Sequence, residues 1–105
     1  MSEQASALLS DVKQYLHVTW QDSETDNRIG MLIDSGIAYL NDKYGKEADY
    51  ASAGYPRTLL FDYVRYARDS ALDVFEANYL HLILAMQIQK ECTDYAEKSA
   101  VSSED

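Results

Sequence analysis

The side chains of this 105-residue chain that are capable of metal or acid-base chemistry do not occur at spacings that support it. The two histidines, His17 and His81, have no cysteine, second histidine or close carboxylate pair at the spacing of metal ligands. Asp69 and Asp73 form a carboxylate pair, but both are expected to face solvent, and paired acids catalyse reactions only when one of them is desolvated. We therefore expect no metal, no cofactor and no enzymatic activity.

Other reactive or ligand-binding motifs are missing from the sequence as well. Cys92 is the only cysteine, so neither an internal disulfide nor a zinc site can form, and a reducing compartment is expected. The four glycines are isolated and nowhere form the GxGxxG or GxxxxGK pattern of a phosphate-binding loop. The residue types and their spacing alone therefore indicate no specific function.

The composition indicates one soluble domain. Apolar residues make up 47% of the chain and charged residues 26%, which is typical of globular proteins. The net charge of -9 repels phosphate backbones and anionic membrane surfaces, so direct nucleic-acid binding is not expected. No apolar run approaches the roughly 20 residues of a membrane span, and the start of the chain lacks the basic flank of a signal peptide. We expect a protein that is made in the cytoplasm and has no membrane partner.

Apolar residues that recur at steps of three and four predict an all-α protein, a small bundle of about four helices. The expected helices span approximately residues 6–16, 23–44, 56–76 and 79–97. Ser6 is expected to cap the first helix, Asp22 or Ser23 begins the second, and Gly45 ends the second. Asn78 would cap the last helix after a break at residues 77–78.

A long loop at residues 45–55 separates the second and third predicted helices. A loop of this length in a small domain is often a binding or lid segment, and a plain connector is the equal alternative. Residues 1–97 are expected to form one domain. Residues 98–105 are rich in serine and acids and are expected to form a disordered tail.

The segment 80–88 fits both a strand and a helix. Its apolar residues alternate as in a strand, yet Leu, Ala, Met and Gln favour a helix, which is our prediction. As a helix it would be apolar on every side from Tyr79 to Ile88, more than a monomer of this size easily covers, and this favours a subunit interface.

Tyrosine is unusually frequent, with nine residues against two Phe and one Trp. Tyrosines suit protein interfaces, where the ring is buried and the hydroxyl stays hydrated, although each one singly could also border a small core. Exposure and aromatic character select these candidate contact residues: Trp20, Tyr50, Tyr55, Tyr79, Leu82, Ile83 and Met86.

Three stretches carry a resemblance to a known family: LLSDVKQYLHVTW, DSETDNRIGMLIDSGIAYLNDKYG and RTLLFDYVRYARDSALDVFEANYLHLILAMQ. In this order they cover roughly Leu8 to Gln89, and the chain resembles the small head-tail connector (adaptor) proteins of tailed bacteriophages. The resemblance implies a helical virion protein without a cofactor, which assembles in the host cytoplasm into a ring of about 12 to 13 subunits. The ring would lie beneath the portal protein and join it to a downstream head-tail or tail adaptor. DNA would pass through its channel without specific binding.

A second function remains open from the residues alone. The chain could be a small cytoplasmic helical regulator that binds one protein partner through Trp20 and the loop at 46–55. The two functions differ in stoichiometry, because a regulator should be a monomer or a two-fold dimer, whereas a connector should form rings.

Overall fold

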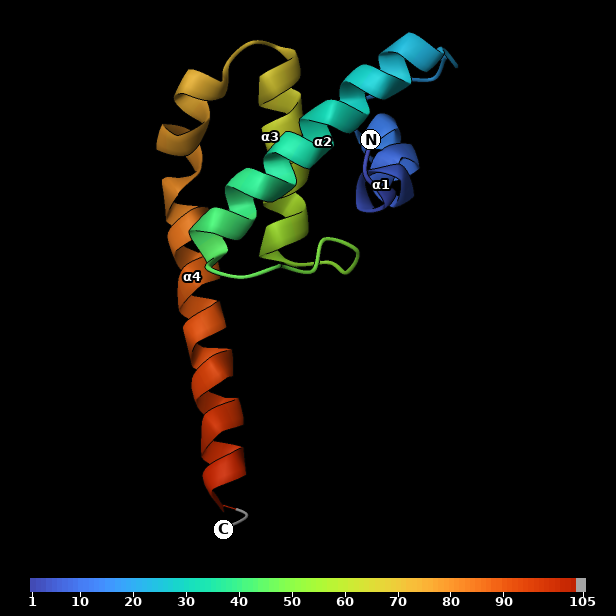
Figure 1. Cartoon of the computed structure of the whole chain (residues 1–105). Helices are drawn as coiled ribbons and strands as arrows, with labels where there is room; N and C mark the ends of the chain where they lie inside the picture. The colour runs from blue at the N-terminus through green and yellow to red at the C-terminus, as the bar shows by residue number, and fades with distance from the viewer. Residues whose placement is uncertain (104–105) are drawn as a thin grey trace.

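The computed structural model describes the backbone of residues 1–103 and the side chains of residues 1–98. It confirms the predicted all-α class, with four helices and no strand in this range. The helices are α1 (Glu3–Tyr15), α2 (Ser23–Tyr44), α3 (Tyr55–Arg68) and α4 (Leu72–Ser103). Helices α2 and α3 lie at the centre, with α1 on one side and α4 on the other (Figure 1). The lower half of α4 extends past the other helices, so the molecule measures 56 × 29 × 19 Å.

Helix α2 has the predicted bounds. The Asp22 carboxylate accepts a hydrogen bond from the Thr25 N–H at 3.2 Å, and Gly45 ends the helix in the left-handed conformation at φ 89°. Gly36 allows close packing, because a Cβ there would lie 2.7 Å from Leu60 Cδ1 of α3. Gly30 lies under the side chain of Met1, whose sulfur would be 2.5 Å from an added Cβ. Gly36 therefore has a packing reason, whereas Gly30 is covered by a flexible side chain.

Helix α1 begins earlier than predicted, and its cap is Ser2 and not Ser6. The Ser2 hydroxyl accepts from the Ala5 N–H at 3.0 Å, while the Ser2 N–H donates to the Asp34 carboxylate of α2 at 2.9 Å. Ser6 lies inside the helix. The contact with Asp34 gives the chain start a tertiary anchor, which adds a turn to the predicted helix.

The prediction of one helix over residues 56–76 is wrong, because α3 ends at Arg68 and α4 begins at Leu72. Ser70 adopts φ 57°, the Ala71 N–H donates to the Tyr66 carbonyl at 2.8 Å, and the Ser70 N–H donates to the Ala67 carbonyl at 3.1 Å. These are the two hydrogen bonds of a Schellman motif, with serine in the position that glycine usually occupies. The predicted break at 77–78 is also wrong, since both residues lie within α4.

The same motif ends α1. His17 adopts φ 61°, its N–H donates to the Gln14 carbonyl at 3.2 Å, and the Val18 N–H donates to the Lys13 carbonyl at 2.9 Å. Val18 is buried and supplies the apolar contact that accompanies such an end. The segment after α1 is thus directed back onto the core before Trp20 returns to the surface.

Helix α4 confirms that residues 80–88 are helical. It continues to Ser103 and therefore includes most of residues 98–105, which the sequence had suggested as a disordered tail. The last two residues of that predicted tail lie outside the described part of the chain.

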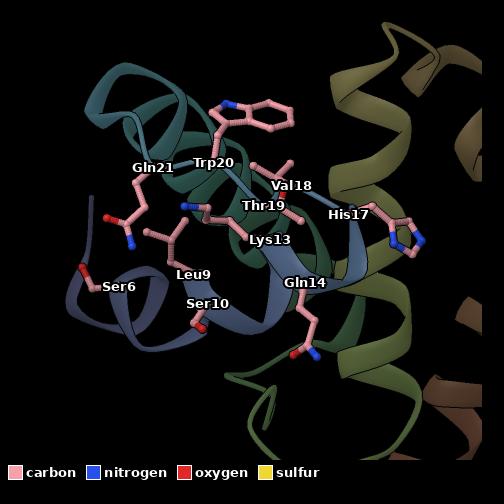
Figure 2. Close-up of a pocket in the computed structure, with 10 residues that line it drawn as sticks. All are labelled: Ser6, Leu9, Ser10, Lys13, Gln14, His17, Val18, Thr19, Trp20 and Gln21. Carbon is pink, nitrogen blue, oxygen red and sulfur yellow. The ribbon is translucent and has the colours of Figure 1, made fainter.

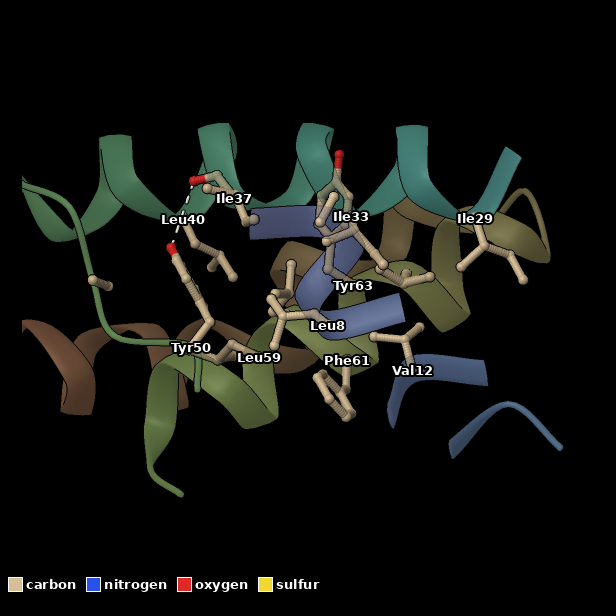
Figure 3. Packing of buried hydrophobic residues seen from close by; sticks show 14 of the residues in the cluster. Leu8, Val12, Ile29, Ile33, Ile37, Leu40, Tyr50, Leu59, Phe61 and Tyr63 are labelled. Atoms are coloured by element: carbon tan, nitrogen blue, oxygen red, sulfur yellow. Dashed lines mark hydrogen bonds between the residues drawn. The ribbon is translucent and has the colours of Figure 1, made fainter. Parts of the chain in front are cut away.

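The core joins all four helices and is rich in aliphatic and aromatic side chains (Figure 3). Phe75 of α4 stacks on Tyr79 at 4.9 Å between ring centroids and meets the edges of Tyr63 and Tyr66 of α3 at 5.5 and 5.6 Å. Tyr39 of α2 joins this aromatic cluster, 5.5 Å from Tyr63. Many of the tyrosines therefore serve the core, where pairs of this geometry add to the stability from burial alone.

The loop between α2 and α3 is held against the body of the protein. Tyr50 is buried, and its hydroxyl donates to the Asn41 side-chain oxygen at 2.7 Å and faces the Ile37 carbonyl (Figure 3). The Asn41 oxygen also accepts from the Ala48 N–H at 3.1 Å. Arg57 closes the loop from the other end, with 3.1 Å to the Tyr50 carbonyl and 2.9 Å to Asp11 of α1.

Candidate protein interaction surfaces

Helix α4 carries apolar residues on two opposite faces. One face buries Phe75, Ile83 and Met86 in the core. The other face points to solvent and holds the residues that we call the α4 stripe: Leu80, Leu84, Ile88 and Tyr95. These four side chains are between 48% and 74% exposed. Their spacing places them on one side of the helix over about 22 Å, and Glu91 lies between Ile88 and Tyr95 on this side.

The end of α4 leaves the body of the protein at the level of Asp94. Gln87 donates to the Lys43 carbonyl at 2.8 Å, and Asp94 forms an ion pair with Lys46 at 3.1 Å. Among the described side chains, none beyond Asp94 forms a hydrogen bond or ion pair with another helix.

A surface hollow of about 590 Å³ lies beside α1 (Figure 2). We call it the α1 hollow, and it is lined by Ser6, Leu9, Ser10, Lys13, Gln14, His17, Val18, Thr19, Trp20 and Gln21. Trp20, one of the predicted contact residues, lines this hollow and is 50% exposed. The α1 residues that line the hollow differ from those that face the core, namely Ala5, Leu8 and Val12. The hollow is therefore an outer surface of α1.

Cationic side chains border the α1 hollow at the end of α1 and α3. Lys13 forms an ion pair with Asp26 of α2 at 2.8 Å. Arg65 and Arg68 line an adjoining hollow of about 370 Å³, and His17 lines both hollows. Arg68 is exposed and makes no ion pair within the described residues. We call Lys13, Arg65 and Arg68 the basic rim. Lys13 and Arg65 are paired with Asp26 and Asp62, and Asp69 lines the same hollow as Arg68, so Arg68 is the member of the rim without an ion pair to a described residue.

A polar network supports this rim from beneath. Asp62 is the buried charged residue of α3, and it accepts a hydrogen bond from the Tyr15 hydroxyl of α1. Arg65 lies 3.7 Å from the same carboxylate and donates to the Tyr79 hydroxyl of α4 at 3.1 Å. Burial, together with the nearby Asp62 carboxylate, raises the pKa of Tyr79 to about 12 and also raises the pKa of Tyr15. Both phenols are therefore protonated at neutral pH, which suits hydrogen-bond donation and not proton abstraction.

The described residues contain no cluster of three His, Cys, Asp or Glu side chains that could hold a metal ion. In the same part of the chain, no helix has both the length and the apolar character that a membrane span requires.

Three of the predicted contact residues belong to the protein's own core. Tyr50, Ile83 and Met86 are buried, so we no longer assign them to a contact surface. Tyr50 is held inward by Asn41, and the two α4 residues lie on the face that packs on α3. The sequence shows that these residues are aromatic or apolar, but it does not show whether each one faces the core or the solvent.

The other predicted contact residues divide into two groups. Tyr55, Tyr79 and Leu82 are partly buried and pack against the core, whereas Trp20 is exposed at the α1 hollow. Sequence reasoning missed the α4 stripe as a set of contact residues. The signal was present in the spacing of Leu80, Leu84 and Ile88, but it can be used only when the opposite face is known to be buried.

The two surfaces thus consist of an apolar band on α4 and a hollow with a cationic border beside α1. Comparison of the chain with models of protein families, with curated protein sequences and with solved structures finds no match.

Proposed function

We propose that this protein is a structural virion protein, a head-tail connector that forms a ring beneath the portal and joins the capsid to the tail. The α4 stripe is the observation that carries this proposal, because it is an apolar surface that the single chain leaves uncovered. The resemblance to head-tail connectors supplies the identity of the assembly. Its partners are other copies of the chain, the portal protein and a downstream adaptor, and its function is contact and not catalysis.

The charge of the protein is consistent with this proposal. A net charge of -9 disfavours binding to a phosphate backbone, and a channel wall must let DNA pass without holding it. The assembly would form in the host cytoplasm and remain in the virion at the junction of head and tail.

The test of this function is the mass of the purified chain over a wide range of concentrations, measured by light scattering, with negative-stain images of the most concentrated sample. We expect a concentration-dependent increase in mass and closed rings of about 12 to 13 subunits. A two-fold dimer as the largest species would contradict the connector, because an isologous contact uses up its surface and cannot continue into a ring.

A regulator that binds one protein partner is the second candidate, and Trp20 favours it. An indole that is 50% exposed beside a hollow of about 590 Å³ is typical of a contact site. The loop between α2 and α3 adds little to this candidate, since Tyr50 and Ala48 are buried. A chain that remains monomeric at every concentration, and that captures one partner in an equimolar complex, would favour the regulator.

A further inference from the structure

The α4 stripe and the α1 hollow lie on different sides of the molecule. The stripe is on the face of α4 opposite to the residues that pack on α3, and α1 lies beyond α2 and α3 (Figure 1). A single copy therefore cannot bring its own stripe to its own hollow. Two unlike surfaces placed in this way are what a head-to-tail contact between identical subunits requires.

The shapes of the two surfaces are complementary, and three of the ten residues that line the hollow are apolar. The stripe is a convex band of large side chains, with Leu84 and Ile88 near its middle. The hollow is concave and has Leu9, Val18 and Trp20 among its lining residues (Figure 2). An amphipathic helix that places its apolar face in a groove is a common mode of protein recognition.

The charges beside the two surfaces are also complementary. Asp73 lies seven residues before Leu80 and Glu91 seven residues after Leu84, so both acids lie on the same side of α4 as the stripe. Both are exposed, and neither forms an ion pair with a described residue. The basic rim beside the hollow includes Arg68, which is likewise exposed. Opposite charges at the edge of an interface guide association and disfavour other orientations.

We propose that the α4 stripe of one copy docks in the α1 hollow of the next copy, with Arg68 beside the hollow facing one of the two acids that share a side of α4 with the stripe. This contact rests on the proposed function, since it is the subunit contact of the ring. Each copy gives one stripe and receives one, so the contact repeats around the ring until the last copy meets the first. A two-fold pairing of stripes is less suitable, because it would cover both stripes and leave Trp20 and both hollows exposed.

The test uses two variants that each remove one half of the contact. Leu84→Asp places a charge in the stripe, and Trp20→Asp removes the indole from the hollow; both positions are about half exposed in the single chain. Each variant alone should assemble only at concentrations about thirtyfold or more above the parent chain. In an equal mixture, the intact stripe of Trp20→Asp meets the intact hollow of Leu84→Asp. The mixture should therefore form a species of two copies and nothing larger.

Two controls keep the result interpretable. Circular dichroism should show the helix content of the parent chain for both variants, which separates loss of contact from loss of fold. Met31→Asp changes an exposed side chain on α2 that lies on neither surface, and it should assemble like the parent chain.

The outcomes distinguish this contact from the function on which it rests. Rings formed by either variant at the concentrations at which the parent chain forms them would overturn the contact and leave the connector standing. Dimers in the mixture that contain only Trp20→Asp, and no Leu84→Asp, would have the same meaning. A parent chain that is monomeric at its highest concentration would overturn the contact and the proposed self-assembly together.

Discussion

Two glycines in α2 have the same helical conformation but different surroundings. A Cβ at Gly36 would lie 2.7 Å from Leu60 Cδ1 and 2.8 Å from Tyr63 Cδ1, and both side chains are buried between α2 and α3. A Cβ at Gly30 would meet only the flexible side chain of Met1, which is half exposed and free to move aside. The two positions should therefore respond in opposite ways to the same substitution.

Gly36→Ala should destabilise the protein by about 1 to 3 kcal/mol, since the added methyl group overpacks a filled core. Gly30→Ala should stabilise it by up to about 1 kcal/mol, because alanine has the better helix propensity. Urea unfolding followed by circular dichroism measures both effects. Ser35→Ala, next to Gly36 but exposed, is the control and should change the free energy of unfolding by less than about 0.5 kcal/mol. Equal effects of the two glycine substitutions would show that packing between α2 and α3 does not decide whether the change raises or lowers the free energy of unfolding.

At the scale of the elements, the ends of α1 and α3 show why a helix boundary can be hard to predict from sequence. Both ends adopt the left-handed conformation without glycine, at His17 and Ser70. Any residue other than glycine costs about 1 to 2 kcal/mol in this conformation, so the surrounding structure must compensate for it. At Ser70 the compensation comes from the aromatic cluster, which forms only when α4 folds back on α3.

Ser70→Gly should therefore raise the free energy of unfolding by up to about 1 kcal/mol, since glycine adopts a positive φ without strain. Asp69→Gly is the matched control, because Asp69 has an ordinary φ of -88° and glycine there only adds freedom to the unfolded chain. It should lower stability by about 0.5 to 1 kcal/mol. Thermal unfolding of the two variants and the parent chain gives the comparison. A loss of stability in Ser70→Gly would mean that the serine side chain, and not the backbone conformation, holds the turn.

The elements could be predicted wherever the signal was local. Asp22 and Gly45 are the best residue types for the two ends of α2, and its bounds were predicted correctly. The end of α3 was missed because Ser70 is a poor residue for its position and is set there by contacts with residues that follow. The start of α1 was missed because Ser2 is anchored by Asp34, which lies 32 residues away in the sequence.

The candidate surfaces could be predicted only in part, for a related reason. An apolar helix such as the middle of α4 has two usable faces, and its sequence does not say which one meets the rest of the chain. Met86 and Leu84 are two residues apart and of similar character, yet the first is buried and the second is about half exposed. Only the direction from which α3 approaches separates them, and that direction is a property of the folded chain.

At the scale of the whole molecule, ion pairs between elements far apart in sequence make stability depend on pH. Glu76 lies 2.9 Å from Lys43 of α2, and the hydrogen bond between them lowers the pKa of Glu76 and raises the pKa of Lys43. Hydrogen bonds from Lys46 and Lys90 lower the pKa of Asp94 in the same way. These carboxylates stabilise the fold above their unfolded pKa values, near 4.5 and 3.8, and the contribution is lost as the pH falls through the lower folded values.

The lysines act at the other end of the pH range. The raised pKa of Lys43 contributes stability below its unfolded value of 10.5, and this is lost as the pH rises through the folded value. We expect the free energy of unfolding to be level between about pH 6 and 9 and to fall on both sides. Urea unfolding across this range tests the shape.

The double variant Glu76→Gln/Asp94→Asn should show a smaller loss of stability than the parent chain between about pH 5 and pH 3. Both pairs are exposed, so the difference should decrease in high salt. Glu91→Gln, an exposed acid without an ion pair to the described residues, is the control. If the free energy of unfolding falls equally with pH in the double variant and the parent chain, these ion pairs do not contribute to the stability.

The aromatic cluster has a consequence for how many copies a ring contains. In a closed ring each copy is turned relative to the last by a full circle divided by the number of copies, and twelve and thirteen copies differ by only about 2° per step. In the contact that we propose, this angle is the inclination of α4 relative to α1. That inclination depends on how α4 packs on α3, where Phe75 and Tyr79 contact Tyr63 and Tyr66 at centroid distances between 5.4 and 5.6 Å. A small change in how these aromatic side chains pack inside one subunit would therefore change the number of copies in the closed assembly.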